Sequence, residues 1–275
     1  MAELKFLIEN TKVSGSKLET EHGLSIHVET QNLNFIFDCG HTGLAWKNAE
    51  LLNVNLAEIQ FAVLSHSHYD HAGGFPSLLK YANPKVIYTG TNFWQEKYSY
   101  NMETNEFKYK GCGFTWRDLQ NWRIRQEICN DMLEIDGNTW LIGNFKRRYE
   151  FETIPEKFKR GVNKQADDFS DEICLVIREE DGAAIITGCA HNGILNIITT
   201  VNERLNLPIY SVIGGIHLKG ADSNRIDQTL TEMENLGITK LYICHCSGEE
   251  VQRKLGVTKL AGYKISTGSK LIIPA

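Results

Sequence analysis

A short apolar strand that runs directly into a cluster of histidines limits the possible folds of this chain more than any other feature. The run from Phe61 to Leu64 is uniformly apolar, as a buried strand would be, and the ten residues after it, from Ser65 to Gly74, read Ser-His-Ser-His-Tyr-Asp-His-Ala-Gly-Gly. Side chains two residues apart on an extended segment point the same way, so the first two histidines of the cluster are expected to converge. The fold must therefore leave the end of a buried strand open to a site.

The residue types in this cluster are those that bind a metal ion. His66 and His68 can share one ion, while Asp70 and His71, in the turn that follows, can reach a neighbouring position. Imidazole nitrogens and a carboxylate oxygen suit zinc, iron or manganese, and a site made only of soft ligands is excluded. The alternative is an accidental polar loop, which would not be expected to hold four potential ligands within six residues and then a Gly-Gly pair that allows close backbone approach.

The pattern of apolar residues along the rest of the chain predicts sheets that are covered by helices. In the first part, short β-like runs are separated by polar or glycine-bearing turns, and from Asp171 onward strand-like and helix-like segments alternate. Such an order implies helices on the outer faces of the sheets. We expect strands at 5–8, 25–29, 35–37, 61–64, 173–177, 184–187, 209–213 and 241–243, and helices at 42–52, 194–205, 226–236 and 249–255.

One stretch interrupts this pattern. Between about residues 91 and 166 the sequence becomes irregular, aromatic and charged. We predict one domain over 1–275 with an insertion at about 91–166 that covers the site, because a segment rich in aromatic residues can wall a pocket. The alternative for any one of these aromatic side chains is that it packs the insertion onto the body of the protein.

The composition excludes several classes of protein. Lys and Arg number 29 against 34 for Asp and Glu, so the net charge of −5 argues against a nucleic-acid partner. No apolar run is long enough to cross a bilayer, and Glu3, Lys5 and Glu9 interrupt the segment in which a signal peptide would be apolar. We therefore expect a cytoplasmic protein with no membrane partner. The seven cysteines are odd in number and scattered, so we expect reduced thiols.

The motif His-x-His-x-Asp-His after a buried strand resembles the signature of the metallo-β-lactamase fold. The resemblance implies an α/β architecture, an αββα sandwich of two mixed sheets with the site at one edge. Asp38 matches the acidic residue that supports the metal site in that superfamily, and His245 matches its last metal-binding histidine. Further blocks are similar to a narrower branch, the proteins labelled as dihydropterin-linked synthases of methanopterin biosynthesis: residues 21–25, 188–194, 214–218 and 245–248.

Two positions depart from the superfamily pattern. Most hydrolases of the superfamily carry a metal-bridging aspartate where this chain has Cys189, which could be a thiolate ligand or a bystander beside a weakly held second ion. The third histidine of the family usually precedes the strand predicted at 184–187, yet no histidine lies between His71 and His191. His191 is therefore the candidate for the missing ligand, with an ordinary turn histidine as the alternative.

Three other polar residues have a structural alternative beside a functional one. Asp38 could accept a hydrogen bond from a ligand imidazole or could cap a turn. His217 follows two glycines at a strand end and could touch substrate or metal, or could be satisfied by backbone groups. His22, in a glycine-containing loop, is expected to position other groups rather than to ligate. His27 and His41 are assigned no role.

The other cysteines and motifs narrow the choice further. Cys244 and Cys246 flank His245 on an expected strand end and point away from it, so at most one of them serves the site. No Cys-x-x-Cys, P-loop, Gly-x-Gly-x-x-Gly or Gly-x-Ser-x-Gly motif occurs, which removes zinc-ribbon, nucleotide-binding and serine-hydrolase interpretations as first choices.

Together these features predict a metal-dependent hydrolase that acts on an ester or phosphoester bond of a small molecule. One or two divalent ions, with zinc preferred and iron or manganese as alternatives, would activate a water and stabilise charge on the scissile oxygen, while Asp70 would orient or deprotonate that water and ligate the second ion. The alternatives are an iron-binding oxidoreductase or redox sensor and a non-catalytic metal-binding module. The expected metal ligands are His66, His68, Asp70, His71, Cys189, His191 and His245, with Asp38, His22 and His217 as supporting or substrate-contacting residues. The oligomeric state is left open.

Overall fold

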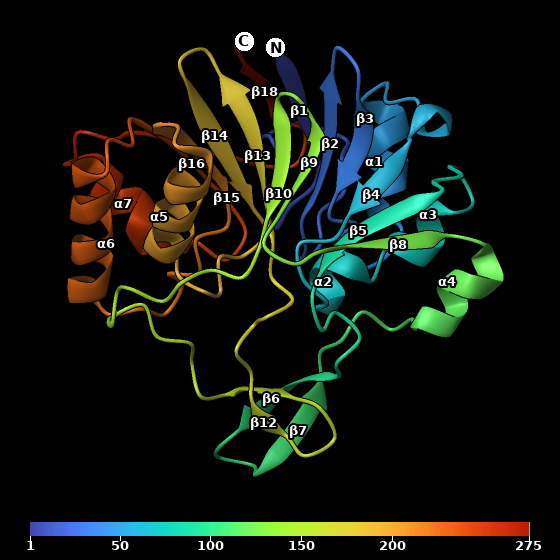
Figure 1. Cartoon of the computed structure of the whole chain (residues 1–275), viewed down its shortest axis with the longest axis horizontal. Coiled ribbons are helices and arrows are strands. Elements are labelled where there is room, and N and C mark those ends of the chain that lie inside the picture. Colours follow the sequence, from blue (N-terminus) through green and yellow to red (C-terminus); the bar gives the residue numbers. More distant parts are fainter. Residues whose placement is uncertain (275) are drawn as a thin grey trace.

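Two seven-stranded sheets pack face to face and carry helices on their outer faces in the computed structural model of the chain, which describes residues 1–274 (Figure 1). This arrangement confirms the expected αββα sandwich. Both sheets are mixed, because each joins a run of antiparallel strands to a run of parallel ones.

The first sheet has the strand order β18-β1-β2-β3-β4-β5-β8. Its central β3, β4 and β5 are parallel, so their C-terminal ends meet at one edge. The first and last strands of the chain, β1 and β18, pair antiparallel, with Ala2 opposite Ile273. The strands are β1 (Ala2–Ile8), β2 (Ser25–Thr30), β3 (Asn34–Phe37), β4 (Phe61–Val63), β5 (Val86–Gly90), β8 (Arg125–Cys129) and β18 (Lys270–Ile273).

The second sheet has the order β17-β16-β15-β14-β13-β10-β9. Here β14, β15 and β16 are parallel and end at the same edge as the parallel strands of the first sheet, where Figure 1 shows a group of loops below the two sheets. The strands are β9 (Met132–Asp136), β10 (Thr139–Ile142), β13 (Cys174–Glu179), β14 (Gly182–Thr187), β15 (Ile209–Gly214), β16 (Lys240–Ile243) and β17 (Ala261–Lys264).

Three apolar clusters follow from this layering. On β14, Ala184 and Ile186 face the other sheet, whereas Ala183 and Ile185 face the helices, as the two-residue period of a strand requires. The first sheet is covered by α1 (Leu44–Leu51), α2 (Tyr69–Ala72), α3 (Phe75–Leu78) and α4 (Trp116–Trp122), and the second by α5 (Ile194–Leu205), α6 (Ser223–Asn235) and α7 (Glu249–Leu255). No helix within residues 1–274 is both long and apolar enough to span a membrane.

A third, smaller sheet lies at the edge where the parallel strands end (Figure 1). It consists of β6 (Lys97–Asn101), β7 (Glu106–Tyr109), β11 (Phe158–Arg160) and β12 (Gln165–Ala166). Residues 91–166 therefore do not form one continuous excursion: β8 completes the first sheet, β9 and β10 complete the second, and only the flanking parts build the small sheet.

The expected elements agree closely with those observed where the apolar pattern is strong. The helices expected at 194–205 and 249–255 are α5 and α7, and the strands expected at 209–213 and 241–243 are β15 and β16 to within one residue at either end. The helix expected at 42–52 is shorter, because α1 begins after Gly43 and ends at Leu51.

Candidate metal centre

The candidate site lies where the parallel strands of both sheets end, which is where ligands bind in open α/β sheets. Asp38 follows β3, and the histidine cluster follows β4. From the second sheet, Cys189 follows β14 and His245 follows β16. The fold thus brings together side chains that lie more than 170 residues apart in the sequence.

Three histidines from both sheets form the first group of candidate ligands. The Nε2 atom of His66 lies 3.1 Å from Nδ1 of His68, and the His191 ring centroid lies 4.9 Å from that of His66 and 5.1 Å from that of His68. The ligand atoms of His66, His191 and Cys189 lie within 4.8 Å of one another. The structure therefore places the candidate His191 beside the first two histidines of the motif.

A second group lies on the other side of Cys189. The two Nε2 atoms of His71 and His245 are 3.1 Å apart, and Nε2 of His245 lies 3.5 Å from a carboxylate oxygen of Asp70. The Cys189 Sγ atom lies 3.2 Å from Nε2 of His71. Cys189 therefore belongs to both groups, at the position where the resemblance places a bridging aspartate.

The donor atoms in these groups fit a divalent ion. Tetrahedral ligands about 2.0 Å from a metal lie roughly 3.3 Å apart, close to the nitrogen–nitrogen distances of 3.1 Å in both groups. The Nε2 atom of His68 and both ring nitrogens of His191 are buried without a hydrogen-bond partner within the described chain. Buried polar atoms are rarely left unpaired, and nitrogen, oxygen and sulfur donors in this mixture suit zinc or iron.

Asp38 sets the orientation of two ligand imidazoles. Its Oδ2 accepts a hydrogen bond of 2.6 Å from Nδ1 of His71 and one of 2.7 Å from the Ser65 hydroxyl, which in turn lies 2.9 Å from Nδ1 of His66. Both histidines thus carry their proton on Nδ1, and each Nε2 lone pair faces the centre. The expectation that Asp38 supports a ligand agrees with this geometry.

His245 is held by two residues that sequence reasoning missed. Asn10 accepts a hydrogen bond of 3.2 Å from Nδ1 of His245 and donates one of 3.1 Å to its carbonyl oxygen, and Glu9 accepts a bond of 2.7 Å from its backbone N–H. The signal was absent from the sequence, because Glu9 and Asn10 lie over 230 residues away on the chain. His245 itself has φ of 54°, a conformation that costs energy and that these bonds help to hold.

Burial determines the charge state of most groups here. Burial lowers the pKa of His66 and His191 well below the usual value and that of His68 to about 3, so these imidazoles are neutral, as ligands must be. Burial also raises the pKa of the Cys189 thiol well above its usual value. A bound metal ion lowers the pKa of a coordinating thiol, so the thiol releases its proton to solvent and binds as a thiolate.

Asp70, in the second group, carries a negative charge. Burial alone would raise the pKa of Asp70, but hydrogen bonds from His22 and His245 hold it well below its usual range, so Asp70 is a carboxylate. Nε2 of His22 lies 3.1 Å from Asp70, and its ring stacks on that of His245 at 4.9 Å. This places His22 at the solvent-exposed side of the second group, in contact with a candidate ligand.

The other predicted residues lie at different distances from the centre. The ring of His217 lies 4.2 Å from that of His191, which places it beside the first group. Of the two cysteines that flank His245, Cys246 turns toward Cys189, whereas Cys244 packs in the core between the sheets. His27 pairs with Asn34 on the first sheet.

Aromatic side chains close the first group from solvent. Phe169 stacks on His191 with ring centroids 3.8 Å apart, and Phe158, from β11 of the small sheet, lies 5.1 Å from His191 and 5.7 Å from His68. The backbone of His68 also forms an isolated bridge with Gly111. Within the segment 91–166, Phe158 and Gly111 thus lie against the first group, whereas the central strands β8, β9 and β10 belong to the two main sheets.

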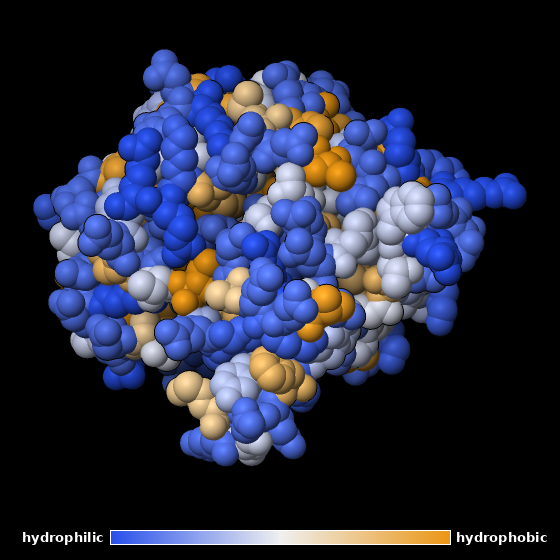
Figure 2. All heavy atoms as spheres, turned by 60° about the horizontal axis from the view of Figure 1, so that its bottom comes forward, coloured by the Kyte–Doolittle hydropathy of each residue, from blue (hydrophilic) through white to orange (hydrophobic). Residues whose placement is uncertain are grey.

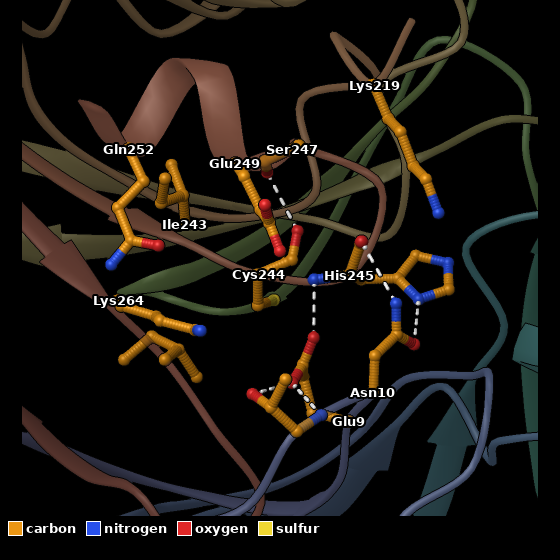
Figure 3. A pocket seen from close by; sticks show the side chains of 13 residues that line it. Glu9, Asn10, Lys219, Ile243, Cys244, His245, Ser247, Glu249, Gln252 and Lys264 are labelled. Carbon is orange, nitrogen blue, oxygen red and sulfur yellow. Dashed lines mark hydrogen bonds between the residues drawn. The ribbon is translucent and has the colours of Figure 1, made fainter. Parts of the chain in front are cut away.

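A pocket of about 370 Å³ opens beside the second group (Figure 3). His245 and Asn10 form one wall, and the side chains of Lys219, Lys264 and Glu249 extend around it. Within residues 1–274, neither lysine forms an ion pair with a carboxylate. The molecular face that carries the small sheet is mostly hydrophilic, and its apolar side chains occur in small groups (Figure 2).

Comparison with known proteins agrees with the fold of the chain. Residues 19–127 match the sequence model of the metallo-beta-lactamase superfamily. The chain is 29% identical over 257 residues to the 7,8-dihydropterin-6-methyl-4-(beta-D-ribofuranosyl)-aminobenzene-5'-phosphate synthase of Methanocaldococcus jannaschii, covering 88% of this chain and 86% of that protein. An uncharacterized protein of the same organism is 27% identical over 255 residues, covering 92% and 93%. A crystal structure described as a metal-dependent hydrolase of the beta-lactamase superfamily has a TM-score of 0.86 and 28% identity, with 100% of each chain covered.

Proposed function

Because the chain belongs to the metallo-β-lactamase superfamily, we propose that it is a metal-dependent hydrolase that acts on an ester or phosphoester of a small molecule. The observation that carries this proposal is the convergence of two ligand groups on Cys189, one built from His66 and His191 and the other from His71 and His245. Such a pair of groups can hold two ions close enough to act on one substrate.

The bound ions would supply a water of lowered pKa and a positive charge for the scissile oxygen, with zinc preferred and iron or manganese as alternatives. The chain itself contributes the orientation and the proton acceptor. Asp70 is an ionised carboxylate at the accessible side of the second group, where it can orient a water and take its proton. His22, 3.1 Å from Asp70, can stabilise the charge on that carboxylate and pass the proton on to solvent.

The pocket beside His245 supports an acidic substrate. Lys219 and Lys264 bring two ammonium groups without ion-pair partners in the described chain to its lining, so an anionic group such as a phosphate is favoured over a neutral one. The Lys219→Ala and Lys264→Ala variants are expected to raise KM for a phosphoester and to leave KM for a neutral ester unchanged. An equal effect on both substrates would mean that the lysines do not contact the acidic group.

Metal content tests the site itself. His66→Ala, His68→Ala and His191→Ala are each expected to lose the first ion, because each removes one of only three or four protein ligands, and to lose hydrolysis with it. Cys189→Ala is expected mainly to change occupancy of the second position or metal preference, since loss of a soft ligand favours harder ions. His27→Ala, which removes a histidine remote from the centre, serves as the control. Full metal content in the His66 and His68 variants would refute the proposal.

A second candidate function rests on Cys189. A thiolate shared by both groups favours iron and an oxidoreductase or redox-sensing role over hydrolysis. Elemental analysis of the purified protein distinguishes the two: zinc or manganese supports hydrolysis, and two irons support redox work. Failure to turn over a panel of phosphodiester, thioester and lactone substrates, with metal bound, would support a non-catalytic metal-binding module.

A further inference from the structure

One more cluster of potential ligands adjoins the two histidine-rich groups. The Sγ atoms of Cys189 and Cys246 and a ring nitrogen of His217 lie within 4.8 Å of one another. We propose that these three side chains form a third cation site, which binds a thiophilic divalent ion such as Zn²⁺ or Cd²⁺. The proposal shares Cys189 with the proposed function but does not require hydrolysis.

The sheet topology positions all three side chains. β14, β15 and β16 are parallel neighbours, and the three residues lie in the segments that leave their C-terminal ends: Cys189 after β14, His217 after β15 and Cys246 after β16. Three segments that leave adjacent strands at one edge converge without a further structural element. The cluster is therefore a product of the fold's central strands.

A glycine provides the room for the cysteine. A Cβ atom at Gly215 would lie 2.6 Å from Sγ of Cys246 and 2.4 Å from the carbonyl oxygen of Gly188, both closer than real contacts allow. Only glycine at this position lets Cys246 point toward Cys189, and the Cys246 Sγ atom lies 3.5 Å from the Cys189 carbonyl oxygen. Cys244, two residues earlier, packs instead between the sheets.

The conformation of His217 is restrained, and one of its ring nitrogens has no hydrogen-bond partner in the described part of the chain. Its backbone has φ of 47°, which is unfavourable for a residue with a side chain, and its Nδ1 atom is buried without a hydrogen-bond partner within residues 1–274. The rings of His191 and Phe158, at 4.2 and 5.6 Å, restrict its movement. An unpaired buried nitrogen and a strained backbone are costs that a bound ion would offset.

The donor set selects the kind of ion. Two thiolates and one imidazole match the sulfur- and nitrogen-rich sites of zinc. Zinc in such sites has four ligands, so these three side chains leave one coordination position for a further ligand. Soft sulfur donors disfavour Mg²⁺ and Ca²⁺, which take oxygen ligands. The first two groups together contain five histidines, one carboxylate and a single sulfur, that of Cys189, so each has one sulfur donor where the third cluster has two.

Titration of the metal-free protein with Cd²⁺ under a non-thiol reductant tests the proposal. Bound cadmium per chain is measured by mass spectrometry, and thiolate coordination is measured by the ligand-to-metal absorption in the ultraviolet. We expect Cys246→Ala to bind one Cd²⁺ fewer than the wild type and to lose about half of the thiolate absorption, because one of two sulfur ligands is removed. Cys244→Ala, the matched control on the other side of His245, is expected to keep both.

A second variant distinguishes the loss of a ligand from a folding defect in Cys246→Ala. His217→Gln keeps both thiols and is expected to lose the same ion as Cys246→Ala. Wild-type cadmium stoichiometry and absorption in both variants would overturn the proposal, as would an equal loss in Cys244→Ala. His68→Ala lies outside the third set, so it is expected to keep the Cys246-dependent absorption while losing the first ion, which separates failure of this proposal from failure of the hydrolase assignment.

Discussion

At the scale of single residues, buried carboxylates do much of the positioning around this centre. Glu152 is 2% exposed, and its two oxygens accept hydrogen bonds of 2.9 Å from the backbone N–H groups of Leu195 and Asn196 at the start of α5. Glu172 holds the backbone of His191 and Asn192 in the same way. These bonds satisfy helix N–H groups that have no partner within the helix and fix the loop that carries His191.

The titration of Glu152 makes stability depend on pH. Burial raises its pKa from the ordinary value of 4.5 to about 7, so the folded protein keeps a proton that the unfolded chain has already lost. Stability conferred by this group is therefore lost as the pH rises from about 4.5 to about 7, by up to about 3 kcal/mol. Urea unfolding across this range should show that the wild type loses stability relative to Glu152→Gln, which cannot titrate. Parallel pH curves for the two proteins would contradict this.

The Asp38 carboxylate is predicted to control metal affinity through His71. Asp38→Asn replaces an obligate acceptor with a group that can present N–H to Nδ1 of His71, which would move the ring proton to Nε2 and block its lone pair. We expect metal affinity to fall by about 10–100-fold, measured by competition with a chromophoric chelator. Asp181→Asn, in an exposed turn, is expected to leave affinity unchanged.

How far the sequence predicts the site depends on the distance between partners. His66, His68, Asp70 and His71 lie in one motif, so local spacing was enough to find them. Asn10 carries no such signal, since an asparagine near the start of the chain becomes a partner of His245 only when β1 lies beside the loop after β16. Its role depends on the fold, which the local pattern does not contain.

At the scale of elements, the small sheet is tied to the histidine cluster through a buried ion pair. Lys97 on β6 is 2% exposed and donates to Asp167 at 2.8 Å and Asp171 at 2.6 Å, while Asp171 also accepts bonds from the backbone N–H and hydroxyl of Ser67. The ion pair between Lys97 and Asp171, together with the hydrogen bonds from Ser67, thus connects the small sheet to the segment between His66 and His68. The pattern of aromatic residues predicted the covering role, but not this link, because a lone lysine in a strand is ordinarily exposed.

Lys97→Met is predicted to be strongly destabilising. It leaves two carboxylates buried without their cation, which costs about 3–5 kcal/mol, and it is expected to loosen the small sheet first. Chemical unfolding measures the loss, and limited proteolysis locates it by new cleavage between residues 97 and 110. Lys108→Met, on the exposed strand β7, should change neither; a comparable loss there would point to a general effect of added apolar surface.

The strands β8 and β9 were not predicted from the sequence, and the physical reason is the same for both. β8 and β9 are short and mostly exposed or half-buried, so they lack the continuous apolar run that marks β4 or β14. Their partners lie in two different sheets, which local pattern cannot indicate. By contrast, α5 has a strongly one-sided apolar face and its bounds were predicted to the residue.

At the scale of the whole molecule, the candidate centre connects the two sheets. His66 and His71 belong to the first sheet, and Cys189, His191 and His245 to the second, so a bound ion ties both halves together. A bound ion is expected to stabilise the folded protein by about 2.7 kcal/mol at a free metal concentration 100 times Kd. Removal of the metal with a chelator is therefore predicted to lower the unfolding temperature. Scanning calorimetry measures the shift. His191→Ala should show a smaller response to the chelator, and an equal response would exclude His191 from the ion that bridges the sheets.

The pairing of β1 with β18 has a consequence for how this chain is made. Ala2 is synthesised some 270 residues before Ile273, yet the two are opposite each other in one sheet. Until β18 emerges from the ribosome, β1 presents one unpaired edge, which can pair with another nascent chain. The candidate metal-binding residues Cys189, His191 and His245 all precede β18, so they are synthesised before this delay ends. Closure of the first sheet is thus a late step in biogenesis, and the interval before it is when this protein is most exposed to misassembly.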